Sequence, residues 1–594
     1  MIRAGAAVVL LALLSMIGSA LLPSAIRPAK AVLALSLSLS LGASTVGLLV
    51  WTCGSWVGTW SALPLVGALW VLSLSRASRW GKDVRRMGRL VLALMRSSPF
   101  GSLLLSLPLV ASMPALLAPL SDSDGIRYHV AHPKLFVLTG HVFFYPWDVT
   151  GAFPQAAEML YLVGLELAGG DTAKFLHFGF FLASLTVLAL LVYRGRDMRG
   201  AALIAPFLFA ASPVAAAIAP YGFIDHVALF HLATAVLLLS RRARPVLVGL
   251  ALGGALATKL TAGPAILGLL VVLVLRTPGR ARLRALVAAS LPVVVAFAPF
   301  AIRNVVRTGD PIFPVGYGLL GKPIPGVSAE SARHTLSYNA GLSGPLPIAW
   351  TFEEGKVQTD EVAGPHHLLG LAALAIAFLM PAGRVLIGLI LPYLAVALLA
   401  RPPTRYLMPM FMAFSALEAW ALSHFMRRFA LPLAALVAAP ALVLSIQILW
   451  GDFSSPDYFL GRMSREEFLA RKVPGWRAAA FVNTLPPGGQ VMALDFPSPY
   501  TFDRPWIVEG VLNDPPLKSW LREEPTAERV LARLQALNVR YLVVTPGYGG
   551  GTKVSLYPLA TSRPAALRVI ELRKRLKLLT TIDRVDVYEV PAAR

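Results

Sequence analysis

A polar segment that follows an apolar run at residues 98–120 holds several side chains that can exchange protons or bind cations. Asp122, Asp124, Tyr128, His129 and His132 lie within eleven residues of one another. A carboxylate in this place could act as a general base towards a hydroxyl group, or it could be an ordinary helix N-cap, since Asp is common there. The two histidines and Asp124 could also be proposed as metal ligands. No spacing fixes their geometry and a proline follows at once, so we assign no metal ligand.

A second set of charged residues lies at the ends of apolar segments further along the chain. Lys259 falls inside an apolar stretch, where an unpaired charge is costly, so it either contacts a substrate phosphate or snorkels to the surface. Arg405, next to Tyr406, is in a similar position. Asp225 begins an apolar helix and could be a cap or a substrate-contacting acid. Arg303 could bind substrate or anchor a helix end at the membrane interface.

Several common site motifs are missing from the sequence. It has no Walker loop, no GxGxxG motif after a strand and no zinc-ligand spacing. A single cysteine, Cys53, excludes an internal disulfide. The adjacent His366 and His367 are expected to point in different directions from a helix, so we do not expect them to bind a metal together. The glycine cluster at residues 547–551 is predicted to be a loose turn.

The composition indicates an integral membrane protein. Of 594 residues, 56% are hydrophobic and 14% are charged, and the mean hydropathy is +0.66. A soluble domain carries about 25% charged residues. A membrane helix needs roughly 20 apolar residues. We predict spans at about 5–25, 31–52, 56–75, 98–120, 173–193, 200–219, 223–240, 285–301, 366–383, 384–400, 406–425 and 429–449.

The net charge of +23 is placed where a membrane protein needs it. Residues 451–594 carry a net charge of +5, and the remaining +18 lies in the membrane part, in short loops. The densest of these, residues 76–96, holds seven basic residues. Short basic loops face the cytoplasm. We therefore interpret the charge as an orientation signal and a contact for anionic lipid, and we expect no nucleic-acid partner.

These loops also predict the topology. The basic segments 241–244 and 276–284 both face the cytoplasm, so residues 245–275 must cross the membrane an even number of times. We predict a hairpin of two short helices that turns near Lys259, each arm about 14 residues or roughly 21 Å long. The turn then lies below the outer surface, in protein or in a wet cavity. About 14 transmembrane helices result, with residues 121–172, 303–365 and 451–594 and the N-terminus on the outer side.

The C-terminal part has the pattern of a soluble α/β domain. Predicted helices at 474–484, 526–537 and 564–578 are each followed by a predicted strand, at 490–495, 539–544 and 585–590. The chain is thereby divided into three regions. These are residues 1–97, with extra transmembrane helices and a basic cytoplasmic loop; 98–450, a transmembrane core with outer loop 121–172; and 451–594, an extracytoplasmic α/β domain.

Several motifs in residues 100–425 resemble, in the same order, those of the GT-C membrane glycosyltransferases. The similarity is to bacterial relatives of glycosyltransferase family 39, the group of protein O-mannosyltransferases and lipid A aminoarabinose transferases. The sequence departs from the family pattern at Gly125, where many members have a second acid that Asp122 could replace. The matching elements are Asp124 with Tyr128 and His129, then His132, Pro133 and Lys134; Phe153, Pro154 and Glu158; Ser212, Pro213 and Asp225; Gly254 with Lys259; Arg303 and Asn304 with Thr308 to Pro311; and Arg405 with Tyr406.

The resemblance implies a polytopic α-helical protein of GT-C type with a C-terminal soluble α/β domain. Members of the class take a sugar, a hexose or pentose, from a polyprenyl-phosphate carrier and transfer it to an acceptor on the outer face. Here the acceptor would be an envelope lipid, glycan or protein, and the reaction an inverting displacement. No cofactor is assigned, and a divalent cation stays open. The implied catalytic residues are Asp124, Asp122 and Asp225, and the implied substrate-binding residues are Tyr128, His129, Lys259, Arg303, Arg405 and Tyr406.

The expected location is the plasma (inner) membrane, with many passes. Three other functions stay open at this point: a transporter or flippase for lipid-linked saccharides, a polymerase or ligase that uses them, and a non-catalytic relative. Inverted repeats would favour a transporter, and we see no equally interrupted segments in two halves. The acidic first loop favours the transferase over the polymerase, because it places a carboxylate base that a polymerase need not have. A non-catalytic relative stays open because Gly125 interrupts the usual acid pair.

Overall fold

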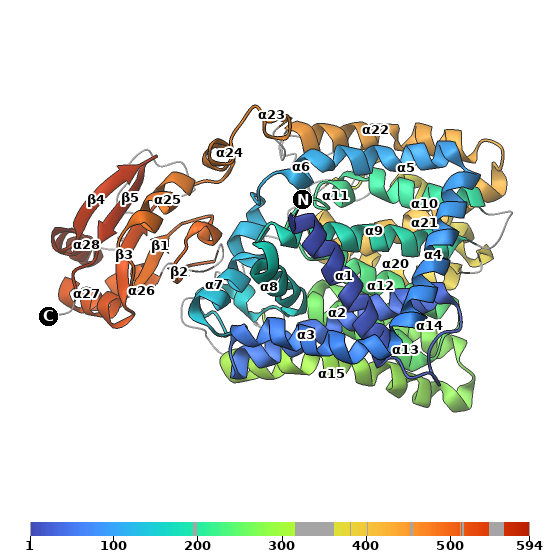
Figure 1. Cartoon of the computed structure of the whole chain (residues 1–594), viewed down its shortest axis with the longest axis horizontal. Coiled ribbons are helices and arrows are strands. Elements are labelled where there is room, and N and C mark those ends of the chain that lie inside the picture. Colours follow the sequence, from blue (N-terminus) through green and yellow to red (C-terminus); the bar gives the residue numbers. More distant parts are fainter. Residues whose placement is uncertain are drawn as a thin grey trace.

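The computed structural model describes residues 2–193, 199–314, 362–380, 382–400, 402–451, 456–510, 513, 516–545 and 563–592. Its helices form one bundle, and a small sheet with its own helices lies at one end (Figure 1). Most of the predicted outward segment 303–365, part of the basic loop after residue 193, and the glycine cluster at 547–551 lie outside the described residues.

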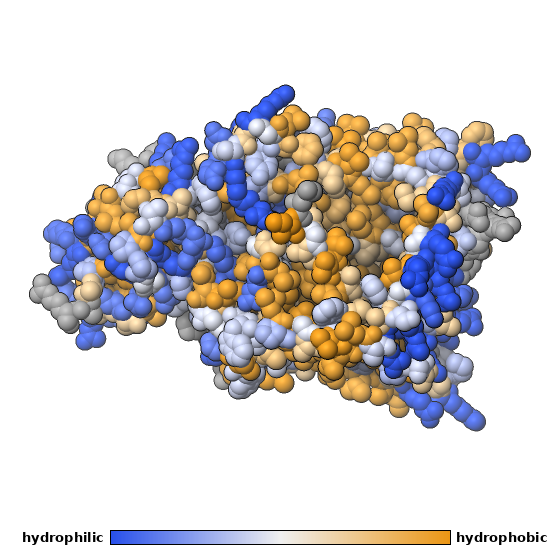
Figure 2. Space-filling view, viewed as in Figure 1, coloured by the Kyte–Doolittle hydropathy of each residue, from blue (hydrophilic) through white to orange (hydrophobic). Residues whose placement is uncertain are grey.

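The bundle is that of a multi-pass membrane protein. In the described part of the chain, six helices are long and apolar enough to cross a membrane: Ile2–Leu21, Ala31–Trp56, Thr59–Ser97, Thr172–Val192, Gly279–Thr308 and Ala430–Gly451. Shorter apolar helices fill the rest of the bundle, so length alone does not fix a count, and 14 spans stays a prediction. Hydrophobic surface covers the bundle, and hydrophilic surface covers the sheet and the opposite end (Figure 2).

The N-terminal helices differ from the prediction at one place. They are α1 (Ile2–Leu21), α2 (Ala31–Trp56), α3 (Ala62–Ser73) and α4 (Ala77–Ser97). The basic segment expected to be a loop is the helix α4. Its charges gather on one face and its apolar residues on the other, a pattern typical of a helix that lies in the membrane interface. Its buried Asp83 accepts a 2.6 Å ion pair from Arg27, which ties α4 to the α1–α2 connection.

The predicted hairpin is confirmed. It consists of α13 (Pro245–Thr258), a short 3-10 turn η6 (Leu260–Ala262) and α14 (Gly263–Arg276), and Lys259 lies at the turn. The long helix α15 (Arg282–Thr308) packs along α13. The hairpin thus brings a lysine to the same end of the bundle as the start of α12 (Asp225–Ser240).

The first outward loop is mostly helical. The span before it breaks into α5 (Pro99–Ala111) and α6 (Met113–Leu117), and the loop itself holds η3 (Gly125–His129), α7 (Ala131–Thr139), η4 (Val149–Ala152) and α8 (Ala156–Ala168). The sequence predicts that Met159, Leu160 and Leu167 of this segment lie on the membrane face. Leu167 is exposed, but Met159 and Leu160 are buried, because α8 packs against α2 inside the protein.

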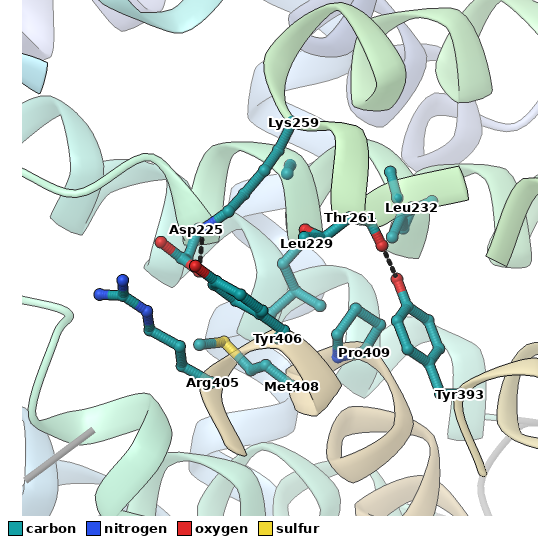
Figure 3. Close-up of a pocket in the computed structure, with 12 residues that line it drawn as sticks. Asp225, Leu229, Leu232, Lys259, Thr261, Tyr393, Arg405, Tyr406, Met408 and Pro409 are labelled. Atoms are coloured by element: carbon teal, nitrogen blue, oxygen red, sulfur yellow. Dashed lines mark hydrogen bonds and ion pairs between the residues drawn. The ribbon is translucent and has the colours of Figure 1, made fainter. Parts of the chain in front are cut away.

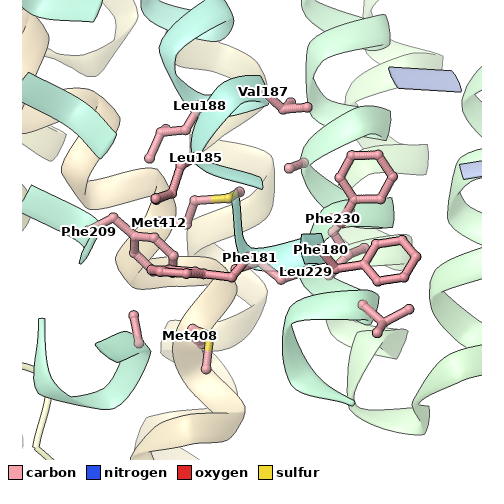
Figure 4. Packing of buried hydrophobic residues seen from close by; sticks show 14 of the residues in the cluster. Phe180, Phe181, Leu185, Val187, Leu188, Phe209, Leu229, Phe230, Met408 and Met412 are labelled. Carbon is pink, nitrogen blue, oxygen red and sulfur yellow. The ribbon is translucent and has the colours of Figure 1, made fainter. Parts of the chain in front are cut away.

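The core of the bundle surrounds α12. Every residue of this helix is buried, including Asp225 at its start. Aromatic and methionine side chains of α9 (Thr172–Val192), α10 (Arg199–Ala211) and α21 (Met408–Phe425) pack around it (Figure 4). A helix that is apolar on all sides needs such complete enclosure. The other elements are α11 (Pro213–Ala216), α19 (His367–Ala373), η8 (Leu374–Leu379), α20 (Gly383–Ala400), η9 (Thr404–Leu407) and α22 (Ala430–Gly451).

The C-terminal region is an α/β unit, as predicted. Its five-stranded sheet has the order β2-β1-β3-β5-β4, in which β2, β1 and β3 are parallel and β3, β5 and β4 are antiparallel. The strands are β1 (Gln490–Leu494), β2 (Trp506–Val508), β3 (Val539–Val544), β4 (Lys577–Ile582) and β5 (Val585–Glu589). The helices are α23 (Pro456–Phe459), α24 (Arg465–Lys472), α25 (Trp476–Thr484), α26 (Pro516–Glu523), α27 (Ala527–Ala536) and α28 (Arg563–Arg575), with the short turn η10 (Pro499–Thr501).

The prediction missed two strands. β2 has only three residues, all buried, so no alternation marks it. We predicted that the last helix would run to residue 578, but α28 ends at Arg575 and β4 begins two residues later.

Three charged side chains join separate parts of the chain at one end of the bundle. Arg3 of α1 forms an ion pair with Asp171, which directly precedes α9. Arg465 of α24 lies 3.1 Å from the same carboxylate. The N-terminus, the end of the first loop and the start of the C-terminal unit therefore share one side, as the predicted topology requires, although the compartment they face stays a prediction.

Candidate active site

Two ion pairs lie side by side where the first loop, the hairpin turn and η9 meet. Lys259 Nζ is 2.7 Å from Asp225 Oδ1, and Arg405 contributes a 2.8 Å pair to Asp124 Oδ2. The aromatic ring of Tyr406 lies between the two cations: the ammonium is 5.0 Å and the guanidinium 5.3 Å from its centroid. The sequence predicted all five residues, and the structure brings them together (Figure 3 shows four of them).

Close packing of helices places Lys259 beside Asp225. A Cβ atom at Gly254 would lie 2.3 Å from Ser44 Oγ and 2.7 Å from His231 Nδ1, so only glycine lets α13 approach α2 and α12 so closely. Lys259 follows five residues later, in extended backbone (φ −153°, ψ 128°), where α13 ends. The Gly-to-Lys spacing therefore has a packing reason in this chain.

The two acids of the first loop differ in their partners. Asp122 is 2% exposed and accepts the backbone N–H groups of Gly125 at 2.8 Å and Gly222 at 3.1 Å. Asp124 instead accepts a 2.6 Å hydrogen bond from Tyr128 as well as the pair with Arg405. Asp122 thus ties two loops together through main-chain groups, whereas Asp124 faces only side chains.

The structure also gives a reason for the glycine that departs from the family pattern. A Cβ atom at Gly125 would lie 2.3 Å from the Asp122 carboxylate, which accepts the Gly125 N–H. An acid at this position would therefore require Asp122 to move. In this chain the second acid of the first loop lies three residues earlier and has a turn-stabilising contact.

The electrostatic surroundings separate the same two acids. Burial raises the pKa of Asp122 above its usual range, and the N–H groups of Gly222 and Gly125 oppose that shift only in part. Burial would also raise the pKa of Asp124, but the positive charge of Arg405 outweighs it and holds this pKa below its usual range. Asp124 is therefore ionised at neutral pH.

A cavity opens beside the ion pairs. Its polar end is formed by Asp225, Lys259, Arg405 and Tyr406, and its apolar wall follows one face of α12 and the start of α21 (Figure 3). The space inside it that a water-sized molecule can occupy is about 20 Å³, room for about one water. The remaining lining residues are Ala228, Leu229, Leu232, Thr261, Ala262, Tyr393, Met408 and Pro409.

Two predicted substrate contacts have other partners here. Arg303 donates to the backbone carbonyls of Ala152 (2.6 Å) and Phe153 (2.9 Å) and to Gln155 (3.0 Å), so it holds the end of the first loop and does not line the cavity. His129 bonds to Glu158 at 2.8 Å and lies beneath the ring of Tyr128. Glu158, a buried acid near the start of α8, was not among our predicted site residues, although it was one of the elements that match the family pattern.

The three residues considered as metal ligands do not converge. Asp124 is paired with Arg405 and His129 with Glu158. The third, His132, lies 3.9 Å from Asp148, and burial lowers its pKa to about 4. The first loop therefore has no metal site among its described residues.

The bundle, the first loop and the attached sheet have a fold of the GT-C type. No family model matches the sequence, and no curated protein matches it. Among solved structures, the chain is similar to ArnT from Cupriavidus metallidurans bound to undecaprenyl phosphate, with 14% identity and a TM-score of 0.53 over 84% of this chain and 99% of that one. The apo state of the same protein gives a TM-score of 0.52.

A more distant similarity is to the archaeal oligosaccharyltransferase AglB from Archaeoglobus fulgidus. Its identity is 14% and its TM-score 0.41, over 74% of this chain and 69% of that one. At such identities the comparison with ArnT confirms the fold that the motifs implied, and it leaves the activity and the site residues to be argued from this chain.

Proposed function

We propose that the protein is a glycosyltransferase that moves a sugar from a polyprenyl-phosphate carrier to an acceptor of the cell envelope, by one displacement with inversion. The observation that carries the proposal is the cavity with Lys259 and Arg405 at its polar end and an apolar wall along α12 and α21. A lipid phosphate has the same two-part chemistry: an anionic group attached to an apolar chain.

The cavity offers about 20 Å³ of enclosed space, so a carrier phosphate and the first part of its isoprenoid would enter as the lining side chains move aside. The sugar would then extend towards the first loop, where Asp124, Tyr128 and His129 lie. The structure of ArnT with undecaprenyl phosphate shows that a bundle with this fold can hold such a carrier.

The two cations suit the departure of the carrier. When the bond between the anomeric carbon and the phosphate oxygen breaks, the electron pair stays on the phosphate, which is already a weak base and needs cations more than a proton donor. A guanidinium has five N–H donors and an ammonium has three. Each cation can therefore hold its carboxylate and still reach a phosphate.

Asp124 would act as the general base. The acceptor hydroxyl gives its proton to the Asp124 carboxylate as its oxygen forms the new bond to the anomeric carbon, from the side opposite the phosphate. An aspartate paired with an arginine is a weak base, but a donor phosphate that attracts Arg405 weakens this pair and makes Asp124 more basic. Asp225 would orient the acceptor or the sugar, and Asp122 would hold the loop.

The reaction would take place on the outer face of the plasma membrane. The N-terminus, the first loop and the C-terminal unit share one end of the bundle, and the basic helix α4 lies towards the other (Figures 1 and 2). The positive-inside rule places the basic end in the cytoplasm. A phosphatase fused after residue 594 should be active and a fluorescent protein there should be dark; the reverse would overturn this orientation.

The test of the function compares a deletion strain with the same strain carrying the wild-type protein or one of two variants. Mass spectrometry of envelope glycans in a deletion strain should show the loss of one sugar, which the wild-type protein restores. Asp124→Asn keeps the shape and removes the basicity, so it should reduce transfer about 10²–10⁴-fold. Asp503→Asn, an exposed aspartate on the C-terminal unit, is the matched control and should restore the sugar fully. Full transfer by a folded Asp124→Asn variant would overturn the proposed mechanism.

A further inference from the structure

Three metal-ligating side chains converge inside the bundle, away from the cavity. His366 and His367 lie at the start of α19, and Glu418 lies in the middle of α21. One ligating atom from each falls within 4.8 Å of the other two, and each residue is at most 3% exposed. We expected the two histidines to diverge, but their ring centroids are 4.0 Å apart. His366 precedes the helix, which allows its ring to turn back over the next one.

Hydrogen bonds among the described residues satisfy this cluster only in part. His366 Nδ1, His367 Nε2 and Glu418 Oε2 are buried and have no hydrogen-bond partner in the described part of the chain. A buried polar atom without a partner is costly, and most such atoms in folded proteins have one. One hydrogen bond, between His367 Nδ1 and Glu418 Oε1 at 3.1 Å, would be enough to join the two helices. It gives no partner to His366 Nδ1, His367 Nε2 or Glu418 Oε2.

One histidine is already held in the form that binds metals. His366 Nε2 lies 3.1 Å from the carbonyl oxygen of Leu208, which can only accept a hydrogen bond. The ring proton is therefore on Nε2, and Nδ1 carries a free electron pair. Metal-ligating histidines are typically oriented in this way, by a carbonyl or carboxylate on the other ring nitrogen.

One pair of ligand atoms already has the spacing of a small transition-metal site. Two ligands of a tetrahedral zinc ion, each bound at about 2.0–2.1 Å, lie about 3.3 Å apart. His367 Nδ1 and Glu418 Oε1, which share a hydrogen bond, are separated by 3.1 Å. The ligating atoms of the three residues lie within 4.8 Å of one another, so the side chains would draw together around the ion. Two imidazoles and one carboxylate are a donor set that suits zinc and related divalent ions rather than calcium or magnesium, which prefer oxygen ligands.

We propose that His366, His367 and Glu418 bind a divalent transition-metal ion, with zinc as the best match, and that this ion fastens α19 to α21. The segment before α19 is held to α11 by Val214 N–H, which donates to Val362 O at 2.8 Å, and His366 itself is held to Leu208 of α10. The ion would therefore join three parts of the bundle. α21 also supplies Met408 and Pro409 to the cavity, so the ion would steady one cavity wall and take no part in the chemistry.

The first experiment measures metal in the full-length protein, purified in detergent through a tag without histidines from zinc-supplemented cells. Elemental mass spectrometry should find about one zinc per chain. Glu418→Gln keeps the shape and should lower bound zinc at least about tenfold. The matched controls are Glu166→Gln, a part-buried glutamate of α8, and His141→Asn, a histidine of the first loop; both should keep the metal. Wild-type protein without any transition metal would overturn the proposal.

A second measurement reports the ligands around the ion directly. Wild-type protein from cells grown with cobalt(II) in place of zinc should show the visible d–d bands of a four-coordinate cobalt site. These bands should be absent in His367→Gln protein that elutes as a monodisperse species. Cobalt that is bound without such bands, or bound equally by wild-type and His367→Gln protein, would show that the ion occupies another place and would overturn the assignment.

Discussion

The first outward loop binds its surroundings differently at its two ends. Near Asp124 it faces the cavity, where its contacts are ion pairs and hydrogen bonds between side chains. The side chains of Arg405 and Asp124 are 14% and 17% exposed. Near Tyr145 it faces the C-terminal unit, where its contacts are with the main chain: the Tyr145 hydroxyl accepts from Val508 N–H at 2.7 Å and donates to Val508 O at 2.9 Å. Gly510 N–H donates to Trp147 O at 2.9 Å.

The difference suggests separate tasks for the two ends. A side chain in a partly open ion pair can exchange partners with a ligand while the fold stays intact. A main-chain contact between two segments cannot be exchanged without separating them. Changes at the cavity end should therefore affect turnover more than stability, and changes at the domain end should do the opposite.

The largest effect is expected from removing both charges of the Lys259–Asp225 pair. Lys259→Gln alone leaves a buried carboxylate without its partner and should destabilise the fold by about 3–5 kcal/mol. The double variant Lys259→Gln/Asp225→Asn avoids this and should fold, yet lose turnover about 10²-fold or more because the phosphate has lost a cation. Initial rates with lipid-linked donor and thermal unfolding in detergent measure the two effects.

The chain supplies a matched control for that double variant. Lys134 and Asp503 form another 2.7 Å pair, between the first loop and the C-terminal unit and outside the cavity. Lys134→Gln/Asp503→Asn should leave turnover within about threefold of wild type, since this pair is largely exposed on one side and worth at most about 1 kcal/mol. Wild-type turnover in the Lys259→Gln/Asp225→Asn protein would reassign Lys259 to snorkelling.

At the domain end, Tyr145→Phe removes one hydroxyl and keeps the ring. Val508 then loses both main-chain hydrogen bonds to the loop inside a buried contact, so the protein should be destabilised by about 1–3 kcal/mol. Turnover at a temperature where the protein stays folded should change less than about threefold. Thermal unfolding and initial rates, measured on the same preparation, test the comparison; a large loss of turnover without destabilisation would break it.

The sequence predicted much of the local structure, but little of which distant side chains contact one another. The hairpin around Lys259 followed from charge parity, and the strands β1, β3 and β5 followed from short apolar runs that each come after a predicted helix. The partnership of Lys259 with Asp225 depends on how closely α13 packs against α12, and no local pattern encodes that distance. Likewise, Glu418 lies more than fifty residues after His366, so only the packing of α19 on α21 brings them together.

A third prediction concerns pH at the domain contact. Glu509 follows β2 and is buried; burial raises its pKa to about 7, against the opposing effects of Asp495 N–H and Arg127 of the first loop. The folded protein therefore retains a proton that the unfolded chain, with its ordinary carboxyl pKa near 4.5, has already released. Stability should fall as pH rises between these two values and level off above pH 7.

The measurement compares wild type with Glu509→Gln, which stays neutral at every pH. Between pH 5.5 and 7.5 wild type should lose about 2 kcal/mol of stability relative to this variant. Glu523→Gln, at an exposed position, should follow the wild-type curve. Equal pH dependence in wild type and Glu509→Gln would show that another group controls the contact.

The smallest effect is expected at Asp122, and it decides which carboxylate is the base. Its two carboxylate oxygens each accept from a different backbone N–H group, so an asparagine keeps one acceptor and turns its NH2 group towards the other N–H. Asp122→Asn should keep turnover within about threefold and lose about 1–3 kcal/mol of stability. Asp122→Ala removes both acceptors, leaves the N–H groups of Gly125 and Gly222 unpaired, and should cost about 2 kcal/mol or more. If Asp122→Asn abolished turnover in a folded protein while Asp124→Asn did not, the base would be Asp122. The Arg405–Asp124 pair would then have the structural role that we assign to Asp122. The comparison between the two ends of the loop would fail at the cavity end.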